Sequence, residues 1–317
     1  MRLANLRLSD GACILAVETA NQTIFDARRM GLEPALSIRD ALTKGDGYLR
    51  ALAKAATAGE PSAVLKETQI ASFLPVAERG AKIFCVGLNY RSHAEELRLP
   101  IPKQPSIFSR YDTTCVGHDQ PILLPKSSHA VDWEGELALV IGKPAKYAGE
   151  RHARALLAGV TCFNDVSMRD FQERLPRITL AKNFDGSGPI GPWLVTMDEA
   201  GDLSDLSIET RVNGRIMQSA STEEFIFPID YLIDLISQVC ALRPGDVIAT
   251  GTPGGVAWKR NPPNYLKDGD IVEVEIGRVG TLRNVARREV EPGAWWKHEA
   301  SPVHDSGPVE TRSVPNS

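Results

Sequence analysis

The sequence predicts an α+β fold that is mainly β, preceded by a small α+β unit at the N-terminus. Apolar runs of strand length end at glycine in residues 81–87 and 137–142, as is typical of buried strands. Residues 269–276 alternate polar and apolar side chains, which indicates a half-exposed strand. Asn213-Gly214 separates two further strand-like runs, and this dipeptide is a strong signal for a tight hairpin.

Composition limits the classes of function. A chain of 317 residues suffices for one large domain or for a large domain plus a small one. The net charge of −4 supplies no basic field, so neither nucleic acid nor a membrane surface is expected as a partner. Charged residues interrupt the N-terminus, which argues against a signal peptide. The five cysteines are scattered singly without CxxC spacing, which predicts free thiols, a cytoplasmic location and no structural zinc.

The first predicted unit covers residues 1–76. Strands are expected near residues 1–8 and 12–17, on either side of an Asp-Gly turn. Ser37 is expected to cap a helix, and a second helix is expected over residues 47–58. No cluster of chemically reactive residues stands out in this unit.

Residues 81–87 lead into a segment with candidate catalytic side chains. Ser92 and Glu95 have the spacing of a capping box, which predicts a helix beginning at His93. His93 and Glu96 then share a helical face, and a helix N-terminus disfavours a charged imidazolium. His93 is therefore a candidate base oriented by Glu96. In the alternative, Glu95 is only a cap and the histidine–carboxylate pair decorates the surface.

Two carboxylates, Glu134 and Glu136, stand immediately ahead of the buried strand expected at residues 137–141. Residues two apart on a strand share a face and lie roughly 7 Å apart. Buried anions require a positive partner, and a hard divalent cation suits carboxylate oxygens. The alternative is a solvated strand end with both glutamates in water or paired with Lys or Arg, and spacing alone favours it. Glu273 and Glu275 have the same spacing on a strand where they are expected to face solvent.

An apolar strand predicted at residues 160–163 delivers Asp165 at its end. Asp165, Arg169 and Gln172 have the spacing of one face of a helical turn. Arg169 is then either a substrate contact or a salt-bridge partner. Lys182 precedes a Gly- and Pro-rich segment that is expected to be a rigid loop, and it is either a positioned cation or a solvated side chain.

The C-terminal part returns to strands and one helix. Strands are expected at residues 207–212, 215–218 and 247–250. The glycine-rich loop that follows Lys182 matches no nucleotide-binding motif. A helix is expected to begin at Pro228 and to bury one apolar stripe. The stripe consists of Ile229, Leu232, Ile233, Ile236 and Val239.

Five motifs along residues 81–290 resemble the fumarylacetoacetate hydrolase family, in the family's order. They are GLNYRSHAEE (87–96), HAVDWEGELALVIGK (129–143), FNDVSMRDFQ (163–172), AKNFDGSGPIGPWLVT (181–196) and RPGDVIATGTPGGV (243–256). The resemblance implies a mixed β-roll of packed sheets, usually as a homodimer, with the catalytic domain at residues 77–293. Residues 1–76 correspond to the family's variable first domain, and the polar residues 294–317 are expected to be a disordered tail.

The resemblance also implies a site and reverses the preference for a solvated strand end. Glu134, Glu136 and Asp165 correspond to residues that hold a divalent ion, with Mg²⁺ expected and Mn²⁺ or Ca²⁺ as alternatives. The remaining correspondences are the water-activating pair His93 and Glu96, the site lysine Lys182, and the substrate contacts Arg169, Gln172 and Thr252.

One departure from the family pattern concerns Arg110. Relatives commonly carry Lys-Pro where this chain has Arg110-Tyr111. The extra fixed cation near the expected pocket suggests that Arg110 binds a distal carboxylate or polar tail of the substrate.

The predicted function is that of a metal-dependent hydrolase acting on a small 2-oxo acid. It would cleave the C3–C4 bond of a 2,4-dioxo acid (an acylpyruvate) through a metal-stabilised enolate, giving pyruvate and a carboxylic acid. Decarboxylation of oxaloacetate and enol–keto isomerisation are alternatives on the same site, because each passes through the same kind of enolate. Less favoured alternatives are a sugar-acid dehydratase or lyase and a catalytically silent metal-binding relative, although no expected site residue is missing.

Overall fold

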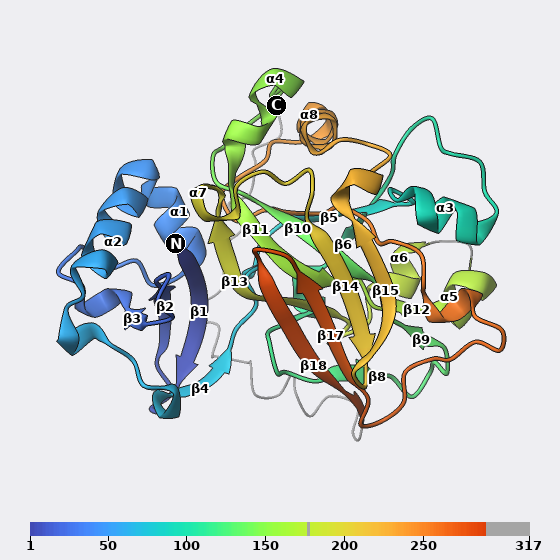
Figure 1. The fold of residues 1–317 in the computed structure, drawn as a ribbon, viewed down its shortest axis with the longest axis horizontal. Coiled ribbons are helices and arrows are strands. Elements are labelled where there is room, and N and C mark those ends of the chain that lie inside the picture. The colour runs from blue at the N-terminus through green and yellow to red at the C-terminus, as the bar shows by residue number, and fades with distance from the viewer. Residues whose placement is uncertain (176–177, 290–317) are drawn as a thin grey trace, which may run out of the picture.

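The computed structural model of the protein describes residues 1–175 and 178–289, and Figure 1 shows its fold. Eleven strands of this part of the chain form one large mixed sheet. They are β1 (Arg2–Leu8), β2 (Cys13–Glu18), β3 (Ile24–Asp26), β4 (Ile70–Phe73), β5 (Ile83–Gly87), β6 (Ser106–Arg110), β7 (Cys115–Val116), β10 (Gly135–Ile141), β11 (Leu157–Asn164), β13 (Gly188–Thr196) and β16 (Val247–Ala249). Their order is β3-β2-β1-β13-β11-β10-β16-β5-β6, with β4 also on β1 and β7 on β13.

A second sheet has the order β15-β14-β17-β18-β8, and β9 and β12 form a separate pair. The bounds are β8 (Ile122–Leu124), β9 (Val131–Asp132), β12 (Ser167–Met168), β14 (Ser207–Val212), β15 (Arg215–Ser221), β17 (Ile271–Ile276) and β18 (Gly280–Arg288). The α-helices of the described chain are α1 (Ile38–Lys44), α2 (Asp46–Ala58), α3 (Arg91–Leu97), α4 (Glu150–Ala153), α5 (Arg169–Arg174), α6 (Ile178–Lys182), α7 (Met197–Ala200) and α8 (Ile229–Val239). This architecture confirms the α+β fold with packed sheets.

The central strand β10 is covered on both faces, which is why all of its residues are buried. On one face Leu137 and Leu139 join a cluster that includes Ile208 and Val274 of the second sheet. On the other face Ala138 joins the cluster under the N-terminal helices. A strand covered on both faces reads as a continuous apolar run, and its start becomes a dry environment for charged groups.

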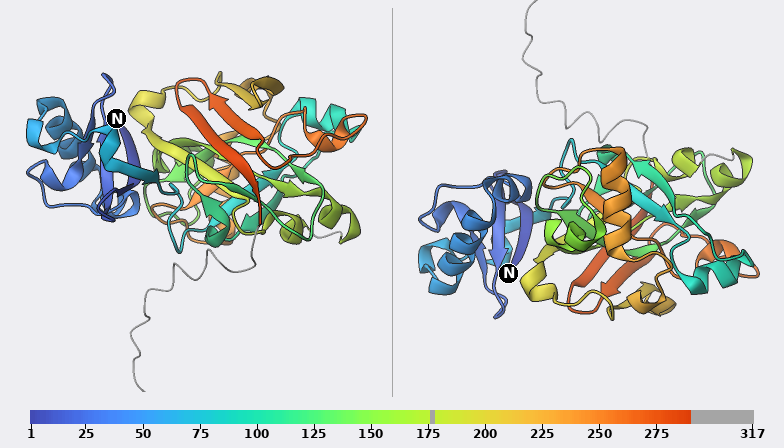
Figure 2. Two further views of the ribbon diagram at one scale, coloured as in Figure 1. Left: turned by 90° about the horizontal axis from the view of Figure 1, so that it is seen from below. Right: turned by 90° about the horizontal axis from the view of Figure 1, so that it is seen from above.

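The N-terminal unit is continuous with the large sheet. Strand β1 pairs with β2 and also with β13, with Arg2 opposite Val195 and Leu3 opposite Leu194. Figure 2 shows this unit, in blue, at one end of the molecule. The domain boundaries proposed from the sequence stay predictions, and residues 290–293 with the expected tail 294–317 lie outside the described residues.

Several local expectations are confirmed. Ser37 caps α1 by accepting a hydrogen bond from the backbone N–H of Asp40. The hairpin at Asn213-Gly214 joins β14 to β15. All five cysteines are free thiols. In the described residues, no helix combines the length and the apolar character needed to cross a bilayer.

Other local expectations are wrong. Helix α3 begins at Arg91 with Tyr90 as its N-cap, so Ser92 lies inside the helix and does not form the expected capping box. The Gly- and Pro-rich segment after Lys182 becomes strand β13 from Gly188, because pairing with β11 and β1 outweighs local turn preference. Val239 is 79% exposed and therefore leaves the buried stripe of α8.

A pH dependence of stability follows from His118, which packs edge-on against Phe73 of the N-terminal unit. Burial lowers the pKa of His118, and Arg283 lowers it further, although Asp119 raises it. The unfolded chain therefore takes up the proton first as pH falls, so the stabilisation from neutral His118 is present above about pH 6.5 and is lost below it. We expect His118→Gln to make the decline in unfolding free energy between pH 7 and 5 shallower, as measured by urea denaturation. An unchanged slope would contradict this assignment.

Candidate metal centre and active site

The two glutamates of the site come from the beginning of β10. Glu136 is its second residue, Glu134 immediately precedes it, and both side chains are buried, with 1% and 6% exposure. Gly135 between them packs so close to the second sheet that a Cβ would lie 2.1 Å from Thr210 Oγ1. Only glycine fits there, so the strand can present both carboxylates on the opposite face. Both carboxylates are therefore buried, unlike the solvated strand end that spacing alone favoured.

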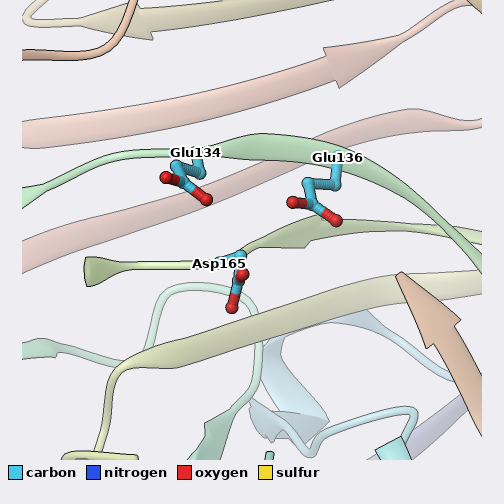
Figure 3. Close-up of side chains that lie close together, drawn as sticks. All are labelled: Glu134, Glu136 and Asp165. Atoms are coloured by element: carbon cyan, nitrogen blue, oxygen red, sulfur yellow. The ribbon is translucent and has the colours of Figure 1, made fainter. Parts of the chain in front are cut away.

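Asp165 joins them because β11 runs antiparallel beside β10. Asn164 pairs with Gly135, and the N–H of Asp165 donates to the carbonyl of Glu134 at 2.8 Å. One carboxylate oxygen from each of Glu134, Glu136 and Asp165 lies within 4.8 Å of the others. Figure 3 shows the glutamates projecting from one strand and Asp165 on the neighbouring segment. Asp165 lies in the loop before β12, not on the helical turn suggested by its spacing to Arg169.

Two buried cations neutralise Glu134. Lys182, at the end of α6, donates to Glu134 Oε2 and to Asp165 Oδ2, both at 2.6 Å. Arg169, at the start of α5, donates to Glu134 Oε1 and, at 2.8 Å, to Asp132 Oδ2. The alternative interpretation placed the glutamates in water or in pairs with Lys or Arg. The structure shows such pairing for Glu134, but in a buried site.

The opposite charges in these ion pairs lower the pKa of Glu134 and raise the pKa of Lys182. Burial alone raises the pKa of Glu134, but Lys182 and Arg169 outweigh it and lower that pKa to about 2. Burial alone lowers the pKa of Lys182, but Asp165 and Glu134 outweigh it and raise that pKa. Both partners therefore remain ionised at neutral pH.

Glu136 differs from its neighbours. Its Oε2 accepts one hydrogen bond from the N–H of Gly251 at 2.9 Å. Among residues 1–175 and 178–289, no cationic side chain forms an ion pair with it. Burial raises the pKa of Glu136 well above its ordinary value, and Asp165 and Glu134 raise it further. The site thus contains a carboxylate that lacks a positive partner.

The donor set fits a divalent cation. Four buried carboxyl groups, from Asp132, Glu134, Glu136 and Asp165, face three buried cationic side chains, so one negative charge is in excess when all four are ionised. The three cationic partners are Arg110, Arg169 and Lys182. Three convergent carboxylate oxygens are the ligands that Mg²⁺, Mn²⁺ and Ca²⁺ prefer. A divalent cation here would supply the positive charge that Glu136 lacks.

His93 and Glu96 form the pair expected from their spacing. His93 Nδ1 lies 3.1 Å from Glu96 Oε2 on α3. Glu96 Oε1 accepts from the N–H of Gly255 at 3.0 Å, which fixes the carboxylate from its other side. After Lys182 and Arg169, His93 is a further cause that lowers the pKa of Glu134. The arrangement leaves Nε2 of His93 for a proton transfer.

The remaining expected residues, Arg169, Gln172 and Thr252, form hydrogen bonds within the protein. Arg169 Nη1 donates to Gln172 Oε1 at 2.9 Å, so these two side chains do meet. Thr252 is buried in the loop after β16, and its hydroxyl donates to the carbonyl of Gly135 at 3.0 Å. Their contacts with substrate stay predictions.

Asp132 is a site residue that the sequence interpretation missed. It is fully buried and accepts hydrogen bonds from the N–H groups of Ala257 and Trp258 at 2.7 and 3.1 Å, in addition to Arg169. It therefore holds Arg169 against Glu134 and joins that pair to the loop after β16. The sequence did offer a sign of this role, because Asp132 stands two residues before Glu134, just as Glu134 stands two residues before Glu136.

Arg110 lies at the end of β6 with its guanidinium buried in the protein. It pairs with Asp165 Oδ1 through Nη1, which also donates to the carbonyl of Val166 at 3.2 Å, and its Nη2 donates to Ser187 Oγ. Both terminal nitrogens are thus used by the protein. The proposed contact with a distal substrate carboxylate stays a prediction.

Arg110→Ala distinguishes a role in holding Asp165 from a role in binding a distal carboxylate of the substrate. Loss of one of the two cationic partners of Asp165 is expected to weaken Mn²⁺ binding by roughly tenfold, as is typical when a group that orients a ligand is removed. Direct contact with a distal carboxylate predicts a larger loss of kcat/KM for 2,4-dioxo acids that carry this group, whereas a role through Asp165 alone predicts an equal loss with and without it. Steady-state kinetics on both substrates decide the matter, since a loss confined to the substrate with the distal carboxylate would support direct contact.

Comparison with known proteins agrees with this architecture. Residues 82–287 match the family model described as fumarylacetoacetate (FAA) hydrolase C-terminal. The mitochondrial oxaloacetate tautomerase FAHD2A of Bos taurus is 42% identical over 256 residues, which cover 80% of this chain and 81% of the relative.

Two solved structures share the fold. The 5-carboxymethyl-2-hydroxymuconate delta-isomerase of Mycobacterium smegmatis is 31% identical with a TM-score of 0.72, covering 92% of this chain and 100% of that one. The maleylpyruvate hydrolase of Sphingobium sp. SYK-6 is 29% identical with a TM-score of 0.74, covering 91% and 100%. With the family model matching most of its length, this chain belongs to the fumarylacetoacetate hydrolase family.

Proposed function

We propose that this chain is a metal-dependent enzyme that hydrolyses the C3–C4 bond of a 2,4-dioxo acid, giving pyruvate and a carboxylic acid. The observation that carries the proposal is the convergence of Glu134, Glu136 and Asp165 beside the His93–Glu96 pair. The three carboxylates are proposed to hold Mg²⁺, with Mn²⁺ or Ca²⁺ as alternatives. The bound cation would supply Lewis-acid stabilisation of the negative charge that develops on the 2-oxo group.

The chain's own groups would perform the proton transfers. His93, oriented through Nδ1 by Glu96, would take a proton from water as the water attacks the C4 carbonyl of the substrate. The buried positive charge of Lys182 would stabilise the developing oxyanion. The C3–C4 bond then breaks with its electron pair on C3, and a proton returns to C3 to give pyruvate. Arg169, Gln172 and Thr252 are the proposed substrate contacts.

A specific observation favours a second candidate reaction, keto–enol tautomerisation of oxaloacetate. The Bos taurus relative named for this activity is 42% identical over 80% of the chain. Tautomerisation needs only a proton transfer between carbon and oxygen, for which the His93–Glu96 pair is again the candidate group. The similar solved structures include one named as an isomerase and one named as a hydrolase, so their names support both candidate reactions.

The test is a panel of acylpyruvates and oxaloacetate, with products identified by mass and tautomer interconversion followed by absorbance. EDTA is expected to abolish turnover, and Mg²⁺ or Mn²⁺ to restore it. Pyruvate plus the matching carboxylic acid would support hydrolysis, whereas interconversion of oxaloacetate tautomers alone would replace it with the second candidate. Release of CO₂ would instead indicate decarboxylation, and no metal-dependent turnover on any substrate would contradict the proposal.

We further propose a cytoplasmic homodimer. The five free thiols support a reducing compartment, although the bovine relative is named as mitochondrial. Sedimentation analysis at micromolar concentration, which should give a mass near twice that of the chain, tests the oligomeric state.

A further inference from the structure

Gln218 is a buried polar residue of the second sheet that the reaction described above does not use. It lies on β15 and is only 1% exposed, although a glutamine near a hairpin is ordinarily expected on the surface. Its side chain reaches toward the beginning of β10 and the loop after β16. One residue that it contacts, Gly135, directly precedes Glu136, and the other two, Thr252 and Pro253, lie in the loop after β16.

Three hydrogen bonds hold the carboxamide of Gln218. Its Oε1 accepts from the N–H of Gly135 at 2.9 Å, and its Nε2 donates to Thr252 Oγ1 and to the carbonyl of Pro253, each at 2.8 Å. A backbone N–H requires an acceptor and a backbone carbonyl requires a donor, so this network defines which end of the carboxamide is nitrogen. Both amide hydrogens are used, and no other residue type offers one acceptor and two donors at this length.

The same network encloses Glu136. Gly135 directly precedes Glu136, and the hydroxyl of Thr252 donates back to the carbonyl of Gly135 at 3.0 Å. Gly251, next to Thr252, supplies the N–H that binds Glu136 Oε2. Gln218 therefore ties together the strand that carries the carboxylate and the loop that holds the carboxylate's oxygen.

The loop after β16 also lies directly against β15. Gly255 has a positive φ of 108°, and a Cβ there would lie 2.1 Å from the carbonyl oxygen of Met217. Arg260 donates to the same Met217 oxygen at 2.9 Å. With the backbone packed this closely, the loop between residues 251 and 255 depends on β15 for its position.

We propose that Gln218 is a positioning residue that fixes Glu136 and the loop at residues 251–255 in the geometry that binds the metal and the substrate. It touches neither directly and acts through Gly135 and Thr252. The inference deepens the proposed function and rests on it, because it takes Glu136 as a metal ligand and Thr252 as a substrate contact.

Two variants separate the contributions of the carboxamide. Gln218→Leu removes all three hydrogen bonds, whereas Gln218→Glu keeps the length and one acceptor but loses both amide hydrogens. Ser219→Ala, at an exposed neighbouring position on the same strand, is the matched control. Thr252→Val, alone and combined with Gln218→Leu, measures coupling along the proposed path.

The first measurement is hydrogen–deuterium exchange of peptides covering residues 251–255 in the metal-free protein. Exchange in both Gln218 variants is expected to be at least tenfold faster than in wild type and in Ser219→Ala. This measurement needs neither metal nor substrate, so it tests the positioning role even if the proposed reaction is wrong.

The second measurement is Mn²⁺ affinity by calorimetry, followed by kinetics. Both Gln218 variants are expected to bind Mn²⁺ and to turn over substrate roughly tenfold to a hundredfold less well, as is typical for groups that orient ligands. The effects of Gln218→Leu and Thr252→Val on KM should be less than additive. A folded Gln218 variant with wild-type exchange at residues 251–255 and wild-type Mn²⁺ affinity would overturn the inference. If Gln218→Leu does not fold, Gln218→Glu and Thr252→Val decide by the same criteria.

Discussion

Glu136→Gln is expected to abolish measurable Mn²⁺ or Mg²⁺ binding while leaving the metal-free protein at least as stable as wild type. Glutamine can still accept the hydrogen bond from Gly251 N–H. It removes a buried carboxyl group that, in the described chain, has no cationic side chain as a partner and whose pKa burial raises. An uncompensated buried charge destabilises a fold, so its removal costs little or is favourable.

Glu134→Gln is expected to differ from Glu136→Gln in its effect on the stability of the metal-free protein. It should also abolish metal binding, but it breaks ion pairs with Lys182 and Arg169 and leaves two buried cations short of a partner. Loss of one member of a buried ion pair typically costs about 3 kcal/mol or more. We therefore expect a clear decrease in the unfolding free energy of the metal-free protein for this variant alone.

The measurements are urea unfolding in EDTA and Mn²⁺ titration by calorimetry. Glu273→Gln is the matched control, because Glu273 has the same i, i+2 relation to Glu275 but lies half-buried on β17 outside the site. Equal destabilisation by Glu134→Gln and Glu136→Gln would show that the two carboxylates have the same electrostatic environment, contrary to the contacts in this structure.

His93→Ala is expected to reduce kcat for hydrolysis of a 2,4-dioxo acid by about a hundredfold to ten-thousandfold, the usual contribution of a general base. Mn²⁺ affinity should remain close to that of wild type, since the proposed metal ligands are the three convergent carboxylates and His93 is not one of the ligands. Glu96→Gln keeps a side chain that can orient the ring but removes its charge, so its effect should be in the same direction and smaller.

His129→Ala is the control for this comparison, because His129 is exposed and lies in the segment before β9. Kinetics at saturating metal, with substrate varied, separate kcat from KM. Retention of most of the activity in His93→Ala would argue against activation of water by this residue. With oxaloacetate as substrate, release of CO₂ that persists in His93→Ala would favour decarboxylation, which needs no attack by water.

Local pattern was sufficient for much of the fold. Ser37 as a helix cap, the Asn213-Gly214 hairpin and the burial of the strand after Glu136 were each readable from a few neighbouring residues. The failures occurred where pairing partners overrule local preference. Pro189 and Pro192 suggested a loop, yet they lie in β13 because β1 and β11 flank that segment.

Spacing alone pointed to Glu134 and Glu136 and to the His93–Glu96 pair, because i, i+2 and i, i+3 spacings determine which side chains share a face. Asp165 was assigned as the third ligand only through the family resemblance. Spacing could not rank a metal site above a solvated strand end, since Glu273 and Glu275 have the same spacing. Burial separates the two pairs, and burial depends on what packs over a strand from elsewhere in the chain.

Tertiary structure alone decided how the charges of the site are partnered. Lys182 and Arg169 reach Glu134 from helices some 35 to 48 positions away, and Arg110 reaches Asp165 across 55 positions. Gln218 meets Gly135 across 83 positions. Electrostatic compensation acts through distance in space and not along the chain, so short-range sequence patterns carry no information about which buried carboxylate is left for a cation.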